Sequence, residues 1–202
     1  MFAIVEAAGW PIWLLIIASV IAVALIAERL VFLRSKSVAP PGLCDETIRE
    51  FNQRGVSDTM LSRLAAGSPL GRVLAAGLKN AKSPPQAMKD AIEEAGRAAA
   101  HELERFLTSL GTIASISPLL GLFGTVVGMI EIFGAQTAIG NSPTVLAHGI
   151  SVALYNTAFG LIVAVPSMIF YRHFRAHVDS LTIEMEQQAV KLVEIVHGTR
   201  KS

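Results

Sequence analysis

The stretch LGTIASISPLLGLFGTVVGMIEIF, residues 110–133, decides the fold of this chain. It contains no charged side chain before Glu131, and it belongs to an uncharged run that extends from residue 106 to residue 130. An α-helix rises 1.5 Å per residue, so about 20 apolar residues cross the hydrocarbon core of a bilayer. The run therefore predicts a transmembrane helix, which we place at residues 106–134.

Two further runs share this character, one at residues 7–27 and one at residues 145–171. Trp10 and Trp13 open the first run, where interfacial tryptophans are common. Turn residues at 135–144 predict a short loop before the last span; they are Gly140, Asn141 and Pro143. The chain is 52% hydrophobic and 16% charged, whereas soluble domains carry roughly 25% charged residues. We expect an all-α integral membrane protein with three transmembrane helices.

Basic residues set the expected orientation, because cytoplasmic flanks of membrane spans are enriched in Lys and Arg. They follow the first span, precede the second and follow the third, and none lies in the loop at 135–144; they are Arg29, Arg34, Lys36, Arg97, Arg105, Arg172 and Arg175. This pattern predicts an outside N-terminus and a cytoplasmic C-terminus, with residues 1–34 as an outer segment plus the first span. Glu6 precedes that span and the cations follow it, which favours a retained anchor over a cleaved signal peptide.

Residues 35–105 are expected to form a cytoplasmic helical block. Helices are predicted at 44–54 and 57–66, from Ser68-Pro69 to about residue 80, and from Pro84-Pro85 onward. No breaker separates the last of these from the second span, which predicts one continuous helix. The third span likewise continues into a cytoplasmic C-terminal helix at 172–202, so long helices are expected to project from the membrane.

Small and hydroxyl-bearing residues form a stripe on each of the last two spans, as is typical of helix–helix contacts in lipid. The first span lacks such a stripe and is expected to face lipid. The stripes and their neighbours give the candidate pore-lining residues: Thr125, Thr157, Ser117, Gly121, Gly128, Ser151, Asn156 and Gly160.

Several polar residues have two interpretations. Thr125 and Thr157 either line a pore or bond back to carbonyl groups of their own helices. Glu131 and His148 either form a channel mouth or are ordinary headgroup-level groups. His173 and His177 are four residues apart, as in some metal sites, but lie where interfacial cations are common.

Enzyme signatures are not satisfied. GLFGTVVG, residues 121–128, lacks the Lys-Ser/Thr ending of a phosphate loop, and no Ser, His and Asp set falls together. The single Cys44 excludes an internal disulfide. The net charge of +1 lacks the excess of positive charge that is typical of nucleic-acid-binding proteins. We expect neither an enzyme nor a cofactor or resident metal.

The two spans, residues 110–133 and GISVALYNTAFGLIVAVPSMIFY at 149–171, resemble the MotA/TolQ/ExbB proton-channel family, nearest to its ExbB branch. The resemblance implies a homopentamer in the bacterial inner membrane around an ExbD-like single-span protein that carries a membrane aspartate. It further implies that proton-motive force energises a TonB-like protein, and that Thr125 and Thr157 are the pore threonines. Better-known members carry a glutamate where this chain has Val152, so that group has no role here.

Three alternatives stay open: a TolQ-type envelope motor, a flagellar-type stator and a non-conducting membrane scaffold. A stator would carry a larger charged cytoplasmic domain than residues 35–105 provide. A stand-alone transporter is disfavoured, because three spans without internal repeats are too few. The sequence leaves sodium open as the coupling ion. It offers no carboxylate in the middle of either of the last two spans, so if the chain conducts protons, the titrating acid must come from a partner.

Overall fold

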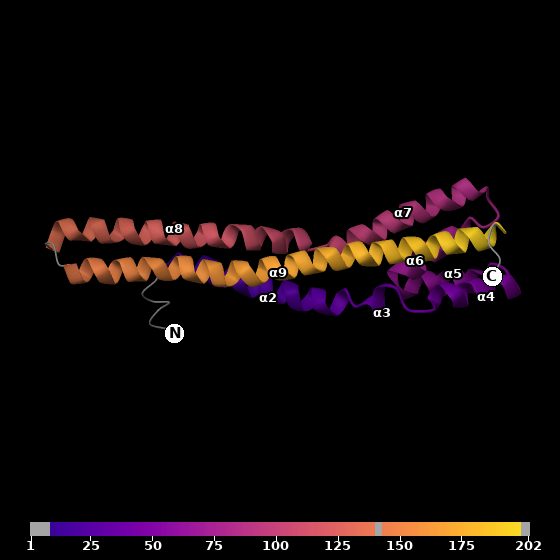
Figure 1. Cartoon of the computed structure of the whole chain (residues 1–202), viewed down its shortest axis with the longest axis horizontal. Helices are drawn as coiled ribbons and strands as arrows, with labels where there is room; N and C mark the ends of the chain where they lie inside the picture. Colours follow the sequence, from indigo (N-terminus) through magenta and orange to yellow (C-terminus); the bar gives the residue numbers. More distant parts are fainter. Residues whose placement is uncertain (1–8, 140–142, 199–202) are drawn as a thin grey trace. The chain divides into compact units, whose positions relative to one another are not determined.

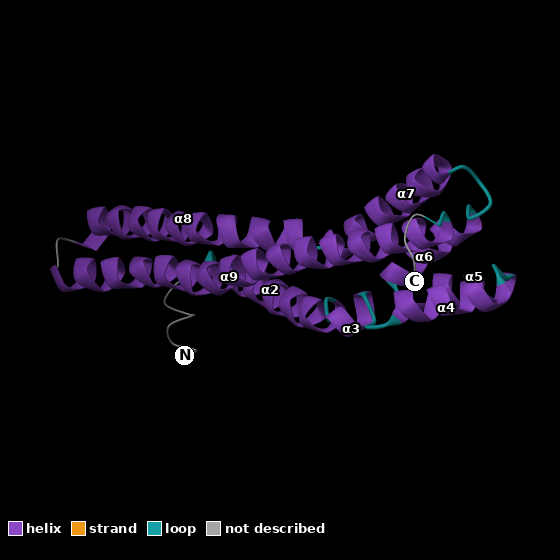
Figure 2. Cartoon of the chain, turned by 45° about the vertical axis from the view of Figure 1, so that its right-hand side comes forward, coloured by secondary structure: helices purple, strands orange, loops and turns teal. Residues whose placement is uncertain are grey.

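The computed structural model describes residues 9–139 and 143–198, without side-chain environments at residues 135–139, 143–146, 148 and 152. Predicted features at Glu6, Gly140 and Asn141 lie outside these residues. Within them the chain forms only helices and connecting turns (Figure 2). The helices are α2 (Ile12–Phe32), α3 (Ser35–Val38), α4 (Leu43–Arg54), α5 (Asp58–Gly67), α6 (Pro69–Lys79), α7 (Pro85–Glu104), α8 (Leu107–Ile139) and α9 (Pro143–Val196).

The chain divides into two compact units. The first comprises Met1–Glu28 and Phe106–His173, and the second comprises Arg29–Arg105 and Phe174–Ser202. Among the residues that the structure describes, three stretches are long and apolar enough to cross a membrane: Ile12–Phe32, Pro85–Gly134 and Gly149–Val196. The protein is thus an all-α membrane protein, as the composition predicts.

In the first unit, α8 and the beginning of α9 lie side by side and run in opposite directions (Figure 1). The helices are longer than the sequence predicts. α8 continues to Ile139, past the predicted end at residue 134, and α9 begins at Pro143. Residues 135–139 contain no helix breaker, and proline fits the first turn of a helix, where its missing N–H costs little.

The predicted continuity of α7 and α8 is wrong. α7 ends at Glu104, and Phe106 adopts a φ of +65°, which belongs to the left-handed region. A continuous helix would use the Leu103 carbonyl to accept a bond from residue 107. Here that carbonyl accepts a bond from the buried Arg29 guanidinium instead, at 3.2 Å. A side chain from a distant helix therefore explains a break that has no local sequence signal.

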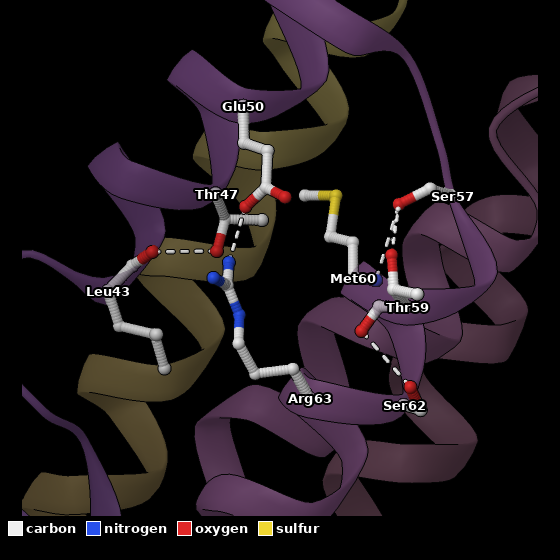
Figure 3. A network of polar contacts seen from close by, with 8 residues as sticks. All are labelled: Leu43, Thr47, Glu50, Ser57, Thr59, Met60, Ser62 and Arg63. Carbon is white, nitrogen blue, oxygen red and sulfur yellow. Dashed lines mark hydrogen bonds and ion pairs between the residues drawn. The ribbon is translucent and has the colours of Figure 1, made fainter.

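In the second unit, helices that follow one another in the sequence pack together, α5 on α6 and α6 on α7. Ser57 and Ser68 cap α5 and α6 through their side chains, as predicted for Ser68-Pro69. Figure 3 shows the α4–α5 contact, where Arg63 pairs with Glu50 beside the Ser57 cap. The continuation of the third span is confirmed, because α9 is a single helix from Pro143 to Val196.

Candidate functional site

Glycines bring α8 and α9 close together along one line. A Cβ on Gly160 would lie 2.6 Å from the Ser117 carbonyl oxygen and 3.1 Å from the Gly121 Cα. A Cβ on Gly121 would lie 2.7 Å from the Asn156 carbonyl oxygen. Backbone meets backbone at these positions, so only glycine fits. We call this contact the α8–α9 seam; it comprises Ser117, Gly121, Gly124 and Gly128 of α8 and Ala153, Asn156 and Gly160 of α9.

The two threonines meet at this seam. Their hydroxyl oxygens, Thr125 Oγ1 and Thr157 Oγ1, lie 2.6 Å apart. Thr125 Oγ1 also lies 3.1 Å from the carbonyl oxygens of Gly121 and Ala153. Thr157 Oγ1 lies 3.4 Å from the same Gly121 oxygen. The hydroxyl of Thr125 thus bonds both to its own helix and across to α9.

This hydroxyl pair is rich in hydrogen-bond acceptors. Two hydroxyls supply two protons, whereas their oxygens and the two carbonyl oxygens offer more lone pairs than two protons can occupy. Both threonine side chains are half-buried, so one side of the pair is accessible from outside the chain. A group that donates a hydrogen bond, such as water or a protonated carboxylic acid, suits this site.

The other candidate residues divide by burial. Ser117 and Asn156 are buried in the seam, with exposed fractions of 0% and 1%. The Ser117 hydroxyl donates to the Ile113 carbonyl of its own helix at 2.7 Å. Gly121 and Gly160 are also buried, and Gly128 is half-buried. Ser151 is exposed, and its hydroxyl donates to the Ala147 carbonyl at 3.0 Å.

The possible channel mouth is only partly described. Glu131 is exposed on α8. The side chain of His148 lies outside the described environments, so its role at a channel mouth stays a prediction. His177 Nε2 lies 2.8 Å from the Leu33 carbonyl oxygen and donates a hydrogen bond to it. Among the described residues, no group of three or more His, Cys, Asp or Glu side chains is placed to hold a metal ion.

Arg29 has a structural role that the sequence does not predict. Arg29 is 2% exposed, although it closes an apolar span. Its guanidinium lies 4.6 Å from the centre of the Phe32 ring and caps the C-terminus of α7 through the Leu103 carbonyl. In the sequence Arg29 is only one of several cations that flank the first span, because nothing local distinguishes it from Arg34.

Comparison with known proteins agrees with this architecture. The model of the MotA/TolQ/ExbB proton channel family matches residues 65–187. An ExbB-like biopolymer transport protein of Synechocystis sp. is 32% identical over 163 residues, covering 78% of this chain and 77% of that protein.

Two other relatives cover similar shares. Biopolymer transport protein exbB1 of Vibrio cholerae is 33% identical over 168 residues, 79% of this chain and 72% of that protein. The Tol-Pal system protein TolQ of Pseudomonas aeruginosa is 29% identical over 184 residues, 83% of this chain and 80% of that protein. The chain therefore belongs to the MotA/TolQ/ExbB proton channel family.

Proposed function

We propose that this chain is the channel subunit of an inner-membrane motor in which proton flow energises a TonB-dependent transport system. The observation that carries the proposal is the hydroxyl pair, Thr125 Oγ1 and Thr157 Oγ1 at 2.6 Å. It provides acceptor oxygens on otherwise apolar helices, where a proton carrier needs polar contacts. Thr125, Thr157 and Ser151 then face the pore, and the buried seam residues form the wall behind them.

The acid that carries the proton comes from a second protein in this proposal. The sequence has no Asp, Glu, Lys or Arg at residues 107–130 or 143–171, so these two stretches supply no carboxylate of their own. Threonine hydroxyls do not titrate, but they accept a bond from a protonated carboxylic acid. The family resemblance points to an ExbD-like single-span partner inside a homopentamer. Each charge that crosses 100 mV releases about 2.3 kcal/mol, which the partner helices use for motion.

Proton flux into vesicles that contain the chain and its ExbD-like partner tests the proposal. Thr157→Val and Thr125→Val each keep the volume of the side chain and remove the hydroxyl. We expect flux to fall about tenfold or more, because a lost buried hydrogen bond costs about 1–3 kcal/mol. Thr157→Ser restores the hydroxyl and serves as the matched control. Full flux in both valine variants at normal expression would remove the hydroxyl pair from the mechanism.

A TolQ-type motor is the second candidate, because the TolQ relative covers 83% of this chain. The same hydroxyl pair serves either motor, so the site does not distinguish them. Complementation does: the chain and its partner are introduced into strains that lack either the ExbB–ExbD pair or the TolQ–TolR pair. Restored TonB-dependent uptake without restored envelope integrity supports the first candidate, and the reverse result supports the second.

A further inference from the structure

Two consecutive residues of α9 rest on two glycines of α8. A Cβ on Gly124 would lie 2.7 Å from the Asn156 Cγ and 2.8 Å from its Cβ. A Cβ on Gly121 would lie 3.0 Å from the Thr157 Cα. The side chain of Asn156 thus occupies the room that Gly124 leaves, and it is 1% exposed. The next residue of α9 is Thr157, whose hydroxyl forms the hydroxyl pair with Thr125.

We propose that Asn156 is the positioning residue of the hydroxyl pair. Its side chain, seated on Gly124, fixes the register of α9 on α8 at which Thr157 meets Thr125. A slide of one helical turn moves a helix by about 5.4 Å, which takes two oxygens that now lie 2.6 Å apart well beyond hydrogen-bond distance. The claim that Asn156 fixes the register rests only on these contacts between α8 and α9. Its effect on proton flow rests on the proposed function.

A cysteine pair one helical turn away reports the register directly. A Cβ on Gly128 would lie 3.4 Å from the Ala153 Cβ, close to the separation of about 3.5–4.5 Å found in disulfides. In a Cys44→Ser background, Gly128→Cys with Ala153→Cys should form an intramolecular disulfide rapidly on mild oxidation. We expect Asn156→Ala to slow disulfide formation several-fold, because the space left beside Gly124 lets α9 shift along α8. Asn156→Asp keeps the shape of the side chain; relative to the parent at the same pH, it should crosslink equally fast while the carboxyl is protonated and more slowly once it ionises.

Proton flux with the ExbD-like partner then tests whether Asn156 acts through Thr157. Asn156→Ala should lower flux about tenfold while subunit assembly, read by co-purification with the partner, stays unchanged. In a Thr157→Val background the same change should add no further loss. A residue that only supported folding would lower assembly and would add its loss in both backgrounds.

The outcomes separate this inference from the proposed function. An unchanged crosslinking rate in Asn156→Ala overturns the positioning role, whatever the flux. A further loss of flux in the Thr157→Val background overturns it as well. If the parent complex conducts no protons but crosslinking depends on Asn156 as described, the register claim stands and the proposed function fails.

Discussion

At the scale of single residues, the seam glycines differ in how much room surrounds them. At Gly160 an added methyl group would meet the Ser117 carbonyl oxygen at 2.6 Å and the Gly121 Cα at 3.1 Å, and neither backbone atom can rotate away. At Gly134, in the same unit, nothing lies within 4 Å of an added Cβ. The seam therefore imposes a requirement for glycine at position 160 that position 134 does not share.

We predict that Gly160→Ala lowers the free energy of unfolding by about 1–3 kcal/mol, the usual cost of overpacking. Gly134→Ala should be neutral or stabilise by up to about 1 kcal/mol, because alanine favours helix. Thermal unfolding of the purified protein in detergent measures both. Equal melting temperatures for the two variants would contradict the close approach of α8 and α9.

Cys44, the only cysteine, is buried, and its Sγ donates a hydrogen bond to the Gln188 carbonyl oxygen at 3.3 Å. Burial raises the pKa of its thiol to about 11, although the nearby Lys191 ammonium acts in the opposite direction. Only the thiolate is reactive, so at pH 8 roughly one thiol in a thousand is available.

We predict that maleimide alkylates Cys44 of the native protein roughly a hundredfold more slowly than an unhindered cysteine at pH 8. The folded pKa exceeds the ordinary value of 9.0, so the thiol's contribution to stability is complete below pH 9 and is lost as the pH rises toward about 11. Mass spectrometry of alkylated samples, native and denatured, measures the rates. Rapid native labelling at pH 8 would show that the contact with Gln188 does not persist.

At the scale of helices, the end of α7 depends on a side chain from α2. Arg29→Met should destabilise the protein by about 1–3 kcal/mol, because the Leu103 carbonyl loses a charged donor within a buried region. Arg34→Met is the matched control, since Arg34 is exposed. Thermal unfolding and protease sensitivity near residues 103–107 provide the measurements. A control variant as unstable as Arg29→Met would contradict the capping role.

Helix ends were predictable where their cause is local. Ser68 followed by Pro69 marks the start of α6, because a capping hydroxyl and a proline act on adjacent backbone groups. The break at Phe106 was not predictable, because no glycine or proline is near it and a bulky residue adopts a φ of +65°. Its cause lies in Arg29, 74 residues before Leu103.

In the candidate site, too, the sequence predicts what depends on local spacing and not what depends on contacts between distant segments. Small residues at helical spacing predicted that α8 and α9 pair and that both threonines lie on the contact. The sequence could not say that Thr125 and Thr157 meet at 2.6 Å, because a distance between side chains depends on helix register. Nor could it separate buried Asn156 from exposed Ser151, since both lie near the same stripe.

At the scale of the whole molecule, the sequence predicts an orientation that labelling can test. In a Cys44→Ser background, Ser142→Cys should react with a membrane-impermeant maleimide added outside spheroplasts. Lys36→Cys should react only after the membrane is permeabilised, because flanks rich in Lys and Arg favour the cytoplasmic side. The opposite pattern would reverse the predicted orientation.

The single helix α9 belongs to both units, because the boundary between them falls between His173 and Phe174. During synthesis, the last turns of α9 leave the ribosome after all the helices that these turns contact. Lys191 reaches Asp45 across 146 residues of chain, and Gln188 reaches Cys44 across 144. Neighbours such as α5, α6 and α7 can associate while the chain is still growing, since their contacts are local. A nascent chain that stops before residue 174 therefore lacks the part of α9 that belongs to the second unit. Quality-control proteases should degrade such a truncated chain.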